Sequence, residues 1–179
     1  MNNKIIFRND DISANSNFKH IQEIYQMILD RFPNAEIYSC ITILAKSNEK
    51  GMVALSENIT KDKRNFYGAD KIFDFTIMPR LYNIISHSLF HCNHRLLSYE
   101  LQKMLILTSC NLLNTNIFIP PLWAWNENTE KICKDNNINL WVAPDWKNID
   151  RIPFNPNHQY WLFHSWKYTP ESFEKAITQ

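Results

Sequence analysis

The chain has 179 residues and a formal net charge of +1, and 45% of its residues are hydrophobic, which suits one domain over residues 1–179 with a sizeable buried core. The near-neutral charge gives no general attraction to nucleic acid or to an anionic membrane, so we expect neither as a partner. The two glycines, Gly51 and Gly68, are too few for a glycine-rich phosphate loop, which excludes nucleotide binding of the Walker or Rossmann kind.

The N-terminal segment and the cysteines bear on the compartment. The apolar run at residues 5–7 is too short for a signal peptide, and no later run is long enough to span a membrane. We therefore expect a cytoplasmic protein without membrane insertion. The cysteines are widely spaced and contain no CxxC pair, which favours buried thiols over disulfides or a zinc cage. They are Cys40, Cys92, Cys110 and Cys133.

The first half of the chain predicts two strands around one helix. Residues 4–8 indicate a short buried strand, and Asn15 or Ser16 can cap a helix over residues 18–32. Residues 36–44 are rich in isoleucine and tyrosine and predict a second strand. The polar stretch of residues 46–70 has no clean period, so we expect a long surface loop there.

The second half continues the alternation of strands and helices. Strands are predicted at residues 82–85, 116–119, 140–143 and 160–163. Ser98 and Asn126 are expected to cap helices, and Pro170 to begin a terminal one. This alternation predicts an α/β fold with a mainly parallel sheet.

Polar residues follow the ends of several predicted strands. Asp10 and Asp11 follow the first strand, His87 and Pro121 follow two internal strands, and His164 follows the last. In βα barrels the active site is built from the loops at the carboxyl ends of the strands. We therefore expect these residues to lie close together.

The spacing of His87 and His91 places both imidazoles on one side of a helix or of a tight turn. Two imidazoles with a distant carboxylate have the ligand types of a divalent-metal site with open positions. The pair is equally compatible with one partly buried and one surface histidine, and His94 offers a competing spacing. The acidic pair Asp10–Asp11 is also typical of a capping turn before a helix.

Two further features suit chemistry on a sugar. His164 at a strand end can act as a general acid, although a histidine there can also be a structural residue with a satisfied hydrogen bond. The loop after Pro121 carries Trp123 and Trp125 and ends at Asn126. Indole faces can stack on sugar rings, but they can equally pack against a core.

Taken in order, these segments resemble the polysaccharide deacetylases, carbohydrate esterase family 4. The resemblance extends from Phe7 to about Trp166 and is closest to the divergent deacetylase-like branch of bacterial surface-polysaccharide loci. It implies a distorted, incomplete (β/α) barrel. The matching segments are Arg8-Asn9-Asp10-Asp11, residues 85–91, Phe118-Ile119-Pro120-Pro121 and Leu162-Phe163-His164.

The resemblance also implies roles for the candidate residues. Asp11, His87 and His91 would hold a divalent metal, usually zinc, with Asp10 as general base and His164 as general acid. The reaction would remove an acetyl group from an N- or O-acetylated sugar or glycan precursor of surface polysaccharide. The residues expected to bind this substrate are Pro121, Trp123, Trp125 and Asn126.

The chain also departs from the family pattern. Ile119 stands where the family has an arginine that pairs with the catalytic aspartate, and Arg8 or Arg151 is the candidate substitute. Asp145–Trp146 matches a later family element weakly, and the chain is short, so a strand can be missing. Two alternatives remain: a catalytically degenerate carbohydrate-binding or partner protein on the same fold, and another two-histidine-one-carboxylate enzyme such as a ferrous oxygenase.

Overall fold

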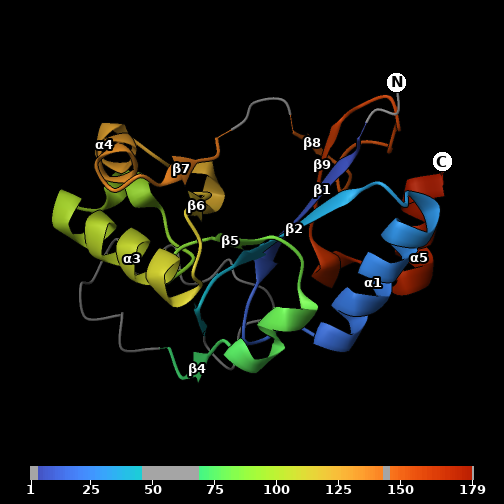
Figure 1. The fold of residues 1–179 in the computed structure, drawn as a ribbon, viewed down its shortest axis with the longest axis horizontal. Helices are drawn as coiled ribbons and strands as arrows, with labels where there is room; N and C mark the ends of the chain where they lie inside the picture. Colours follow the sequence, from blue (N-terminus) through green and yellow to red (C-terminus); the bar gives the residue numbers. More distant parts are fainter. Residues whose placement is uncertain (1–3, 46–68, 143–145, 179) are drawn as a thin grey trace.

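The structure, a computed structural model, describes residues 4–45, 69–142 and 146–178, and Figure 1 shows their arrangement. The helices are α1 (Phe18–Arg31), α3 (Tyr99–Leu112), α4 (Glu127–Asp135) and α5 (Pro170–Thr178), with 3-10 turns η3 (Phe75–Arg80), η4 (His94–Leu96), η5 (Pro121–Trp123) and η6 (Ser165–Lys167). The strands are β1 (Ile6–Ile12), β2 (Glu36–Ile41), β3 (Leu44–Ala45), β4 (Lys71–Ile72), β5 (Ile84–Ser86), β6 (Ile117–Phe118), β7 (Asn139–Leu140), β8 (Lys147–Asn148) and β9 (Tyr160–Phe163).

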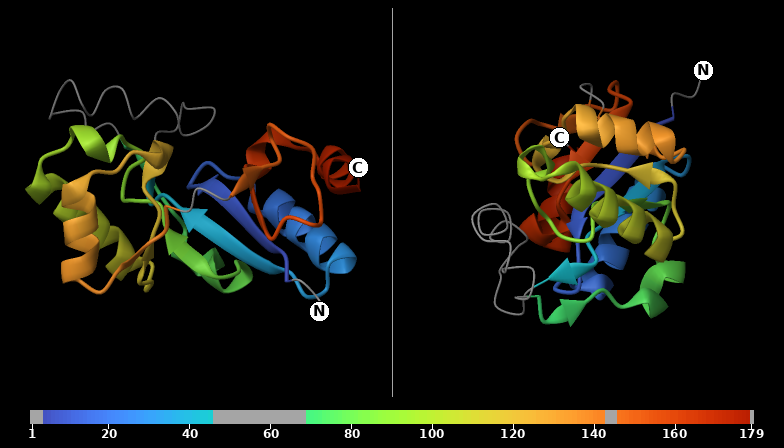
Figure 2. Two further views of the ribbon diagram at one scale, coloured as in Figure 1. Left: turned by 90° about the horizontal axis from the view of Figure 1, so that it is seen from above. Right: turned by 90° about the vertical axis from the view of Figure 1, so that its left-hand side faces the viewer.

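Seven strands form one sheet in the order β7-β6-β5-β2-β1-β9-β8. Each neighbouring pair is parallel, so the carboxyl ends of all seven strands lie along one edge. Strands β7 and β8 end the sheet without pairing with each other in the described part of the chain, which leaves an incomplete barrel (Figure 2). The expected α/β fold with parallel strands is confirmed.

The helices lie on the outer face of the sheet in two groups, α1 with α5 and α3 with α4 (Figures 1 and 2). Helix α1 buries one apolar face, formed by Ile21, Ile24, Tyr25 and Ile28. That face packs into the largest hydrophobic cluster, together with aromatic residues of β1, β9 and α5. A separate cluster holds α3 and α4 against β6. These two apolar clusters, which lie between the sheet and its helices, therefore hold in place the sheet edge that carries the polar residues.

The observed elements differ from the predicted ones mainly at their ends. Ser98 and Asn126 cap α3 and α4 as predicted, whereas Asn17 rather than Asn15 or Ser16 caps α1. Each of these three positions is polar and precedes an apolar period, so spacing alone does not select one. The first strand extends through the acidic pair to Ile12 instead of ending at residue 8.

Other differences concern short segments that carry no periodic signal. Strands β4 and β8 have two residues each and were not predicted, and the predicted strand at residues 36–44 is divided into β2 and β3. Most of the predicted surface loop at residues 46–70 lies outside the described residues. All four cysteines are buried free thiols, as expected, and none of the described helices is long and apolar enough to cross a membrane.

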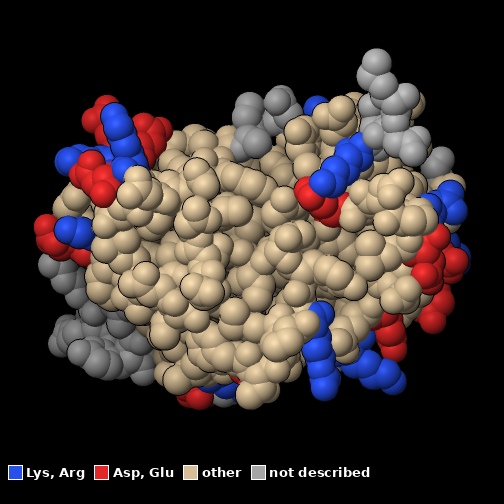
Figure 3. All heavy atoms as spheres, viewed as in Figure 1, with Lys and Arg blue, Asp and Glu red and all other residues tan. Residues whose placement is uncertain are grey.

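Charged side chains of both signs gather in Figure 3 over α4 and around α1 and α5, and a further blue and red group lies on the face near β1. The middle of this face consists of uncharged residues. Among the described residues visible there, positive and negative groups are interspersed. This distribution agrees with the net charge of +1.

Candidate active site

The acidic pair lies on an irregularity of the central strand β1. Asn9 pairs with Ser39 and Ile12 pairs with Ile41 on β2, so β1 contains one residue more than its partner between these points. Such a bulge redirects side chains. Asp11 has a φ of 63°, a left-handed conformation that an aspartate tolerates better than most residues. The bulge therefore explains how two adjacent residues, Asp10 and Asp11, both line one cavity, although neighbours on a regular strand point to opposite faces.

His87 and His91 converge through a turn that follows β5, not through a helix. Ser88 has a φ of 74°, and this left-handed residue reverses the chain directly after His87. The two imidazole centroids lie 5.3 Å apart. The fold thus uses the tight-turn alternative for a spacing of four residues.

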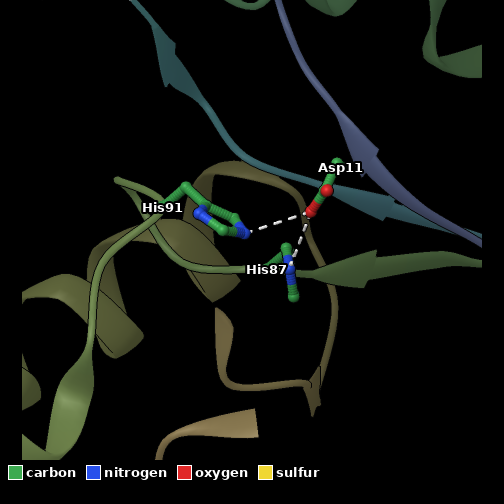
Figure 4. A group of neighbouring side chains, drawn as sticks. All are labelled: Asp11, His87 and His91. Carbon is green, nitrogen blue, oxygen red and sulfur yellow. Dashed lines mark ion pairs between the residues drawn. The ribbon is translucent and has the colours of Figure 1, made fainter. Parts of the chain in front are cut away.

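Asp11, His87 and His91 meet at the carboxyl end of the sheet, as Figure 4 shows. One carboxylate oxygen, Oδ1 of Asp11, lies 3.3 Å from Nε2 of His87 and 3.1 Å from Nε2 of His91. All three side chains are buried. One ligand atom from each residue falls within 4.8 Å of the others, so the three can share one ion.

The tautomer of His87 supports a cation at this point. Its Nδ1 lies 2.9 Å from the carbonyl oxygen of Ile119, and because a carbonyl only accepts, Nδ1 carries the proton. In the neutral ring Nε2 then has a lone pair directed at the Asp11 carboxylate. Nε2 of His87 and Oδ1 of Asp11 would then be two acceptor atoms only 3.3 Å apart. Such a contact is stable only with a cation between the two atoms or with a second proton on the ring. A divalent metal satisfies all three side chains and fits this donor set.

The electrostatics of Asp11 agree with this arrangement. Burial on its own would raise the pKa of Asp11, but contact with His87 and His91, whose rings when protonated donate hydrogen bonds and carry charge, outweighs burial and holds that pKa well below its ordinary value. The carboxylate is therefore ionised and available as a ligand.

His94, the competing histidine of the sequence pattern, is a supporting residue. Burial, followed by the charges of His87 and His91, lowers its pKa to about 3, so its ring is neutral. Its Nε2 lies 3.0 Å from Oγ of Ser88, and its ring packs on Phe118. His94 thus fixes the turn that presents the two candidate ligands.

Asp10 is paired with Arg8 from the same strand. The Nε and NH2 groups of Arg8 donate to the two carboxylate oxygens of Asp10 at 2.8 and 2.9 Å, a bidentate contact in a buried setting. The guanidinium carbon lies 4.6 Å from the ring centroids of both Trp123 and Trp146. Of the two candidate substitutes for the arginine missing at Ile119, the structure therefore pairs Arg8 with Asp10.

His164, at the end of β9, is held by an aspartate that the sequence analysis did not single out. Its Nδ1 is hydrogen-bonded to Oδ2 of Asp150, which also accepts from Nζ of Lys167 at 3.0 Å. Its Nε2 lies 3.5 Å from Oδ2 of Asp11. Burial opposes the charged ring, but the Asp150 hydrogen bond and the charges of Asp11, Asp10 and Asp150 raise the pKa of His164.

These groups open into a cavity of about 550 Å³. Asp10, Asp11, His87, His91 and His164 all line it, which agrees with the expectation that strand-end residues meet. Its remaining walls come from η5, from β8 with its flanking residues, and from β9 with η6. They are formed by Leu122, Trp123, Trp146, Asn148, Arg151, Leu162, Trp166 and Lys167.

The residues expected to bind substrate are divided by the structure. Trp123 lines the cavity, whereas Pro121, Trp125 and Asn126 do not. Asn126 uses its side chain in the capping box of α4, and the indole N–H of Trp125 donates to Glu130. The short loop turns away from the cavity after η5, which spacing along the sequence does not reveal.

Sequence reasoning missed Asp150 and assigned the later aspartate–tryptophan element to Asp145–Trp146. Asp145 lies outside the described residues, and Trp146 stacks on Arg8. Asp150 follows the two-residue strand β8, which is too short for a periodic signal. Its acidic side chain one turn after a strand end was the only available indication.

Comparison with solved structures supports the class of fold. The chain resembles wild-type BA3943 from Bacillus anthracis, a CE4 family pseudoenzyme, with a TM-score of 0.61 and 15% identity over 99% of this chain and 60% of that chain. A BA3943 mutant with restored enzymatic activity gives 0.62 and 15% over 99% and 62%. A family 4 carbohydrate esterase from Streptomyces lividans in complex with acetate gives 0.55 and 10% over 98% and 84%.

No family model and no curated protein sequence matches the chain. The chain spans about three fifths of the length of BA3943. At these identities the likeness concerns the fold: the chain has the α/β half-barrel of the CE4 polysaccharide deacetylases in a strongly divergent sequence. The resemblance read from the sequence motifs is confirmed at that level.

Proposed function

We propose that the protein is a metal-dependent hydrolase that removes an acetyl group from an N- or O-acetylated sugar, a precursor of surface polysaccharide. The observation that carries the proposal is the meeting of Asp11, His87 and His91 in one buried cluster, flanked in the same cavity by Asp10 and His164. A fold shared with a carbohydrate esterase that was solved with acetate supports the same chemistry.

Asp10 and His164 are suited to opposite proton transfers. Asp10, fixed by Arg8, accepts a proton from the attacking water. His164, whose pKa is raised by its aspartate neighbours, is protonated and donates to the leaving amine or alkoxide. Asp11, His87 and His91 would hold a divalent metal, zinc in this proposal, which would polarise the acetyl carbonyl and lower the pKa of a bound water.

Acetate release from N-acetyl and O-acetyl sugars by zinc-loaded protein tests the proposal. We expect Asp10→Asn and His87→Ala each to reduce the rate by about 10²-fold or more, because each removes a group that acts on the reacting atoms. Two matched controls change the same residue types elsewhere: Asp30→Asn and His158→Ala alter exposed residues and are expected to leave the rate unchanged.

Acetate release that survives both Asp10→Asn and His87→Ala would overturn the mechanism. A protein that binds acetylated sugars but releases no acetate over the whole panel would instead match the degenerate alternative. BA3943, whose fold is similar to that of this chain, is itself a CE4 family pseudoenzyme. The retained acid, base and ligand types in this chain favour the enzyme.

A further inference from the structure

Asn9 links the strand of the acidic pair to the segment that carries His164. It lies between Arg8 and Asp10 on β1, so its side chain points away from the cavity that Asp10 lines and toward α1. The backbone ladder between β1 and β9 ends where Asn9 pairs with Phe163, and His164 is the first residue beyond it. The side chain of Asn9 can therefore reach both α1 and the chain that follows β9.

The carboxamide of Asn9 holds Ser165 by two hydrogen bonds. Its Oδ1 accepts from the backbone N–H of Ser165 at 3.0 Å, and its Nδ2 donates to Oγ of Ser165 at 3.1 Å. Nδ2 also donates to the hydroxyl of Tyr25 at 3.3 Å, and that hydroxyl is hydrogen-bonded to Oγ of Ser39 at 2.8 Å. All four residues are buried. Loss of the carboxamide would therefore leave buried polar groups of Ser165 without partners.

Ser165 is fixed at each of its polar groups. Its carbonyl oxygen accepts from the backbone N–H of Tyr168 at 3.2 Å and lies 3.2 Å from Nε2 of His20 on α1, while Asn9 binds its N–H and its hydroxyl. The N–H of Ser165 belongs to the peptide bond that joins this residue to His164. The contact with Asn9 therefore fixes the backbone of His164 directly.

The ring of His164 and its backbone are held by different parts of the fold. Asp150, in the segment after β8, binds Nδ1 of the ring, and Nε2 of the ring lies 3.5 Å from Oδ2 of Asp11. Asn9 instead ties the backbone of His164 to the strand that carries Asp10 and Asp11. A general acid acts only within hydrogen-bonding reach of the leaving group, and a misplacement of about 1 Å can cost roughly 100-fold in rate. The connection through Asn9 is therefore able to affect catalysis.

We propose that Asn9 is a positioning residue for His164: its carboxamide clamps Ser165 and thereby holds the imidazole of His164 at a fixed place relative to Asp10 and Asp11. This inference rests on the proposed function, since it takes His164 as the general acid. In that step Nε2 of His164 gives its proton to the leaving oxygen or nitrogen as the bond from that atom to the acetyl carbon breaks. Asn9 itself contacts neither the substrate nor the reacting atoms.

Two small acetate esters separate this role from a purely structural one, because they differ in their need for a general acid. The 4-nitrophenolate of 4-nitrophenyl acetate leaves as a stable anion, whereas the ethoxide of ethyl acetate must be protonated as it leaves. For zinc-loaded Asn9→Leu we expect kcat/KM to fall about tenfold or more with ethyl acetate and less than about twofold with 4-nitrophenyl acetate. Ser165→Ala, which removes one of the two bonds to Asn9, should show the same selectivity with a smaller fall, and it keeps the test valid if Asn9→Leu fails to fold.

Gln102→Leu is the matched control. Gln102 is a buried carboxamide that is hydrogen-bonded to Leu97, Asn126 and Thr129, so its loss should lower stability but leave the ratio of the two ester rates unchanged.

An equal fall with both esters, no fall with either, or no hydrolysis of either ester by zinc-loaded wild type would overturn the role of Asn9. Failure of the proposed function gives a different result: the esters are hydrolysed with the expected dependence on Asn9, but no acetate is released from any acetylated sugar.

Discussion

At the scale of single residues, the pairing of Arg8 with Asp10 supplies from another position the arginine that is missing at Ile119. The arginine comes from the strand that carries the acidic pair, two residues before Asp10 and on the same face. Its guanidinium is enclosed by Trp123 and Trp146, and cation–π contacts of this kind contribute roughly 2 kcal/mol when desolvated. Asp10, the proposed base, is thus held by a side chain that cannot easily change rotamer.

We predict that Arg8→Met lowers the free energy of unfolding by about 3–5 kcal/mol, because it leaves the buried Asp10 carboxylate without its partner. The double variant Arg8→Met/Asp10→Leu should recover most of this loss, since no buried charge then remains. Urea unfolding measures both values. Equal destabilisation of the single and double variants would contradict the pairing as described.

A second residue-scale prediction concerns Asp150 and the pH dependence. Because the pKa of His164 is raised, its ring stays protonated to a higher pH than an ordinary histidine does. The proton is lost as the pH rises through that pKa. As the proposed general acid, His164 is active below its pKa, so we expect the alkaline limb of kcat/KM to lie above about pH 6.5, the ordinary histidine value. Asp150→Asn removes a carboxylate that raises the pKa and should move this limb to lower pH.

The rate profile of Asp150→Asn against pH provides the measurement. The acidic limb, which reflects other groups, should move less than the alkaline limb. An alkaline limb that stays in place, or moves to higher pH, would show that Asp150 does not act through His164.

At the scale of elements, the sequence identified most of what positions the site. The apolar period of α1 and the cap residues Ser98 and Asn126 predicted helices, and their alternation with strands predicted the parallel sheet. Because the carboxyl ends of parallel strands lie along one edge, the predicted sheet also placed the strand-end residues at a common edge. The bulge at Asp11 was not predictable, because it depends on the register between β1 and β2, which arises only from pairing.

Short elements account for the other omissions. β8 and the residues on either side of it bring Trp146, Asn148 and Asp150 to the site, but a two-residue strand has no hydrophobic period to detect. Similarly, Trp123 and Trp125 of the loop after Pro121 were both predicted to bind substrate. The actual course of this loop directs Trp123 to Arg8 and Trp125 to Glu130.

Asn126 provides a prediction at this scale. Its side chain accepts from the N–H of Thr129, and Thr129 Oγ1 accepts from the N–H of Asn126, a reciprocal pair that begins α4. Asn126→Ala should lower the free energy of unfolding by about 1 kcal/mol, while Asn126→Ser keeps a capping oxygen and should cost less. Equal losses in chemical denaturation would argue against a capping role.

At the scale of the whole molecule, seven parallel strands bring residues from β1, β5, β8 and β9 to one end of an open half-barrel. Residues as distant as Asp11 and His164 are joined there because β1 pairs directly with β9. The fold therefore brings the strand ends together, and the residues at those ends determine which reaction the site can perform.

We propose that Asp11, His87 and His91 hold a catalytic metal, and a crystal structure of zinc-loaded protein with anomalous scattering at the zinc edge is the sharpest test. We expect one strong peak within about 2.0–2.2 Å of Nε2 of His87, Nε2 of His91 and an oxygen of Asp11. Absence of a peak between these three side chains at saturating zinc would show that they do not form a metal site.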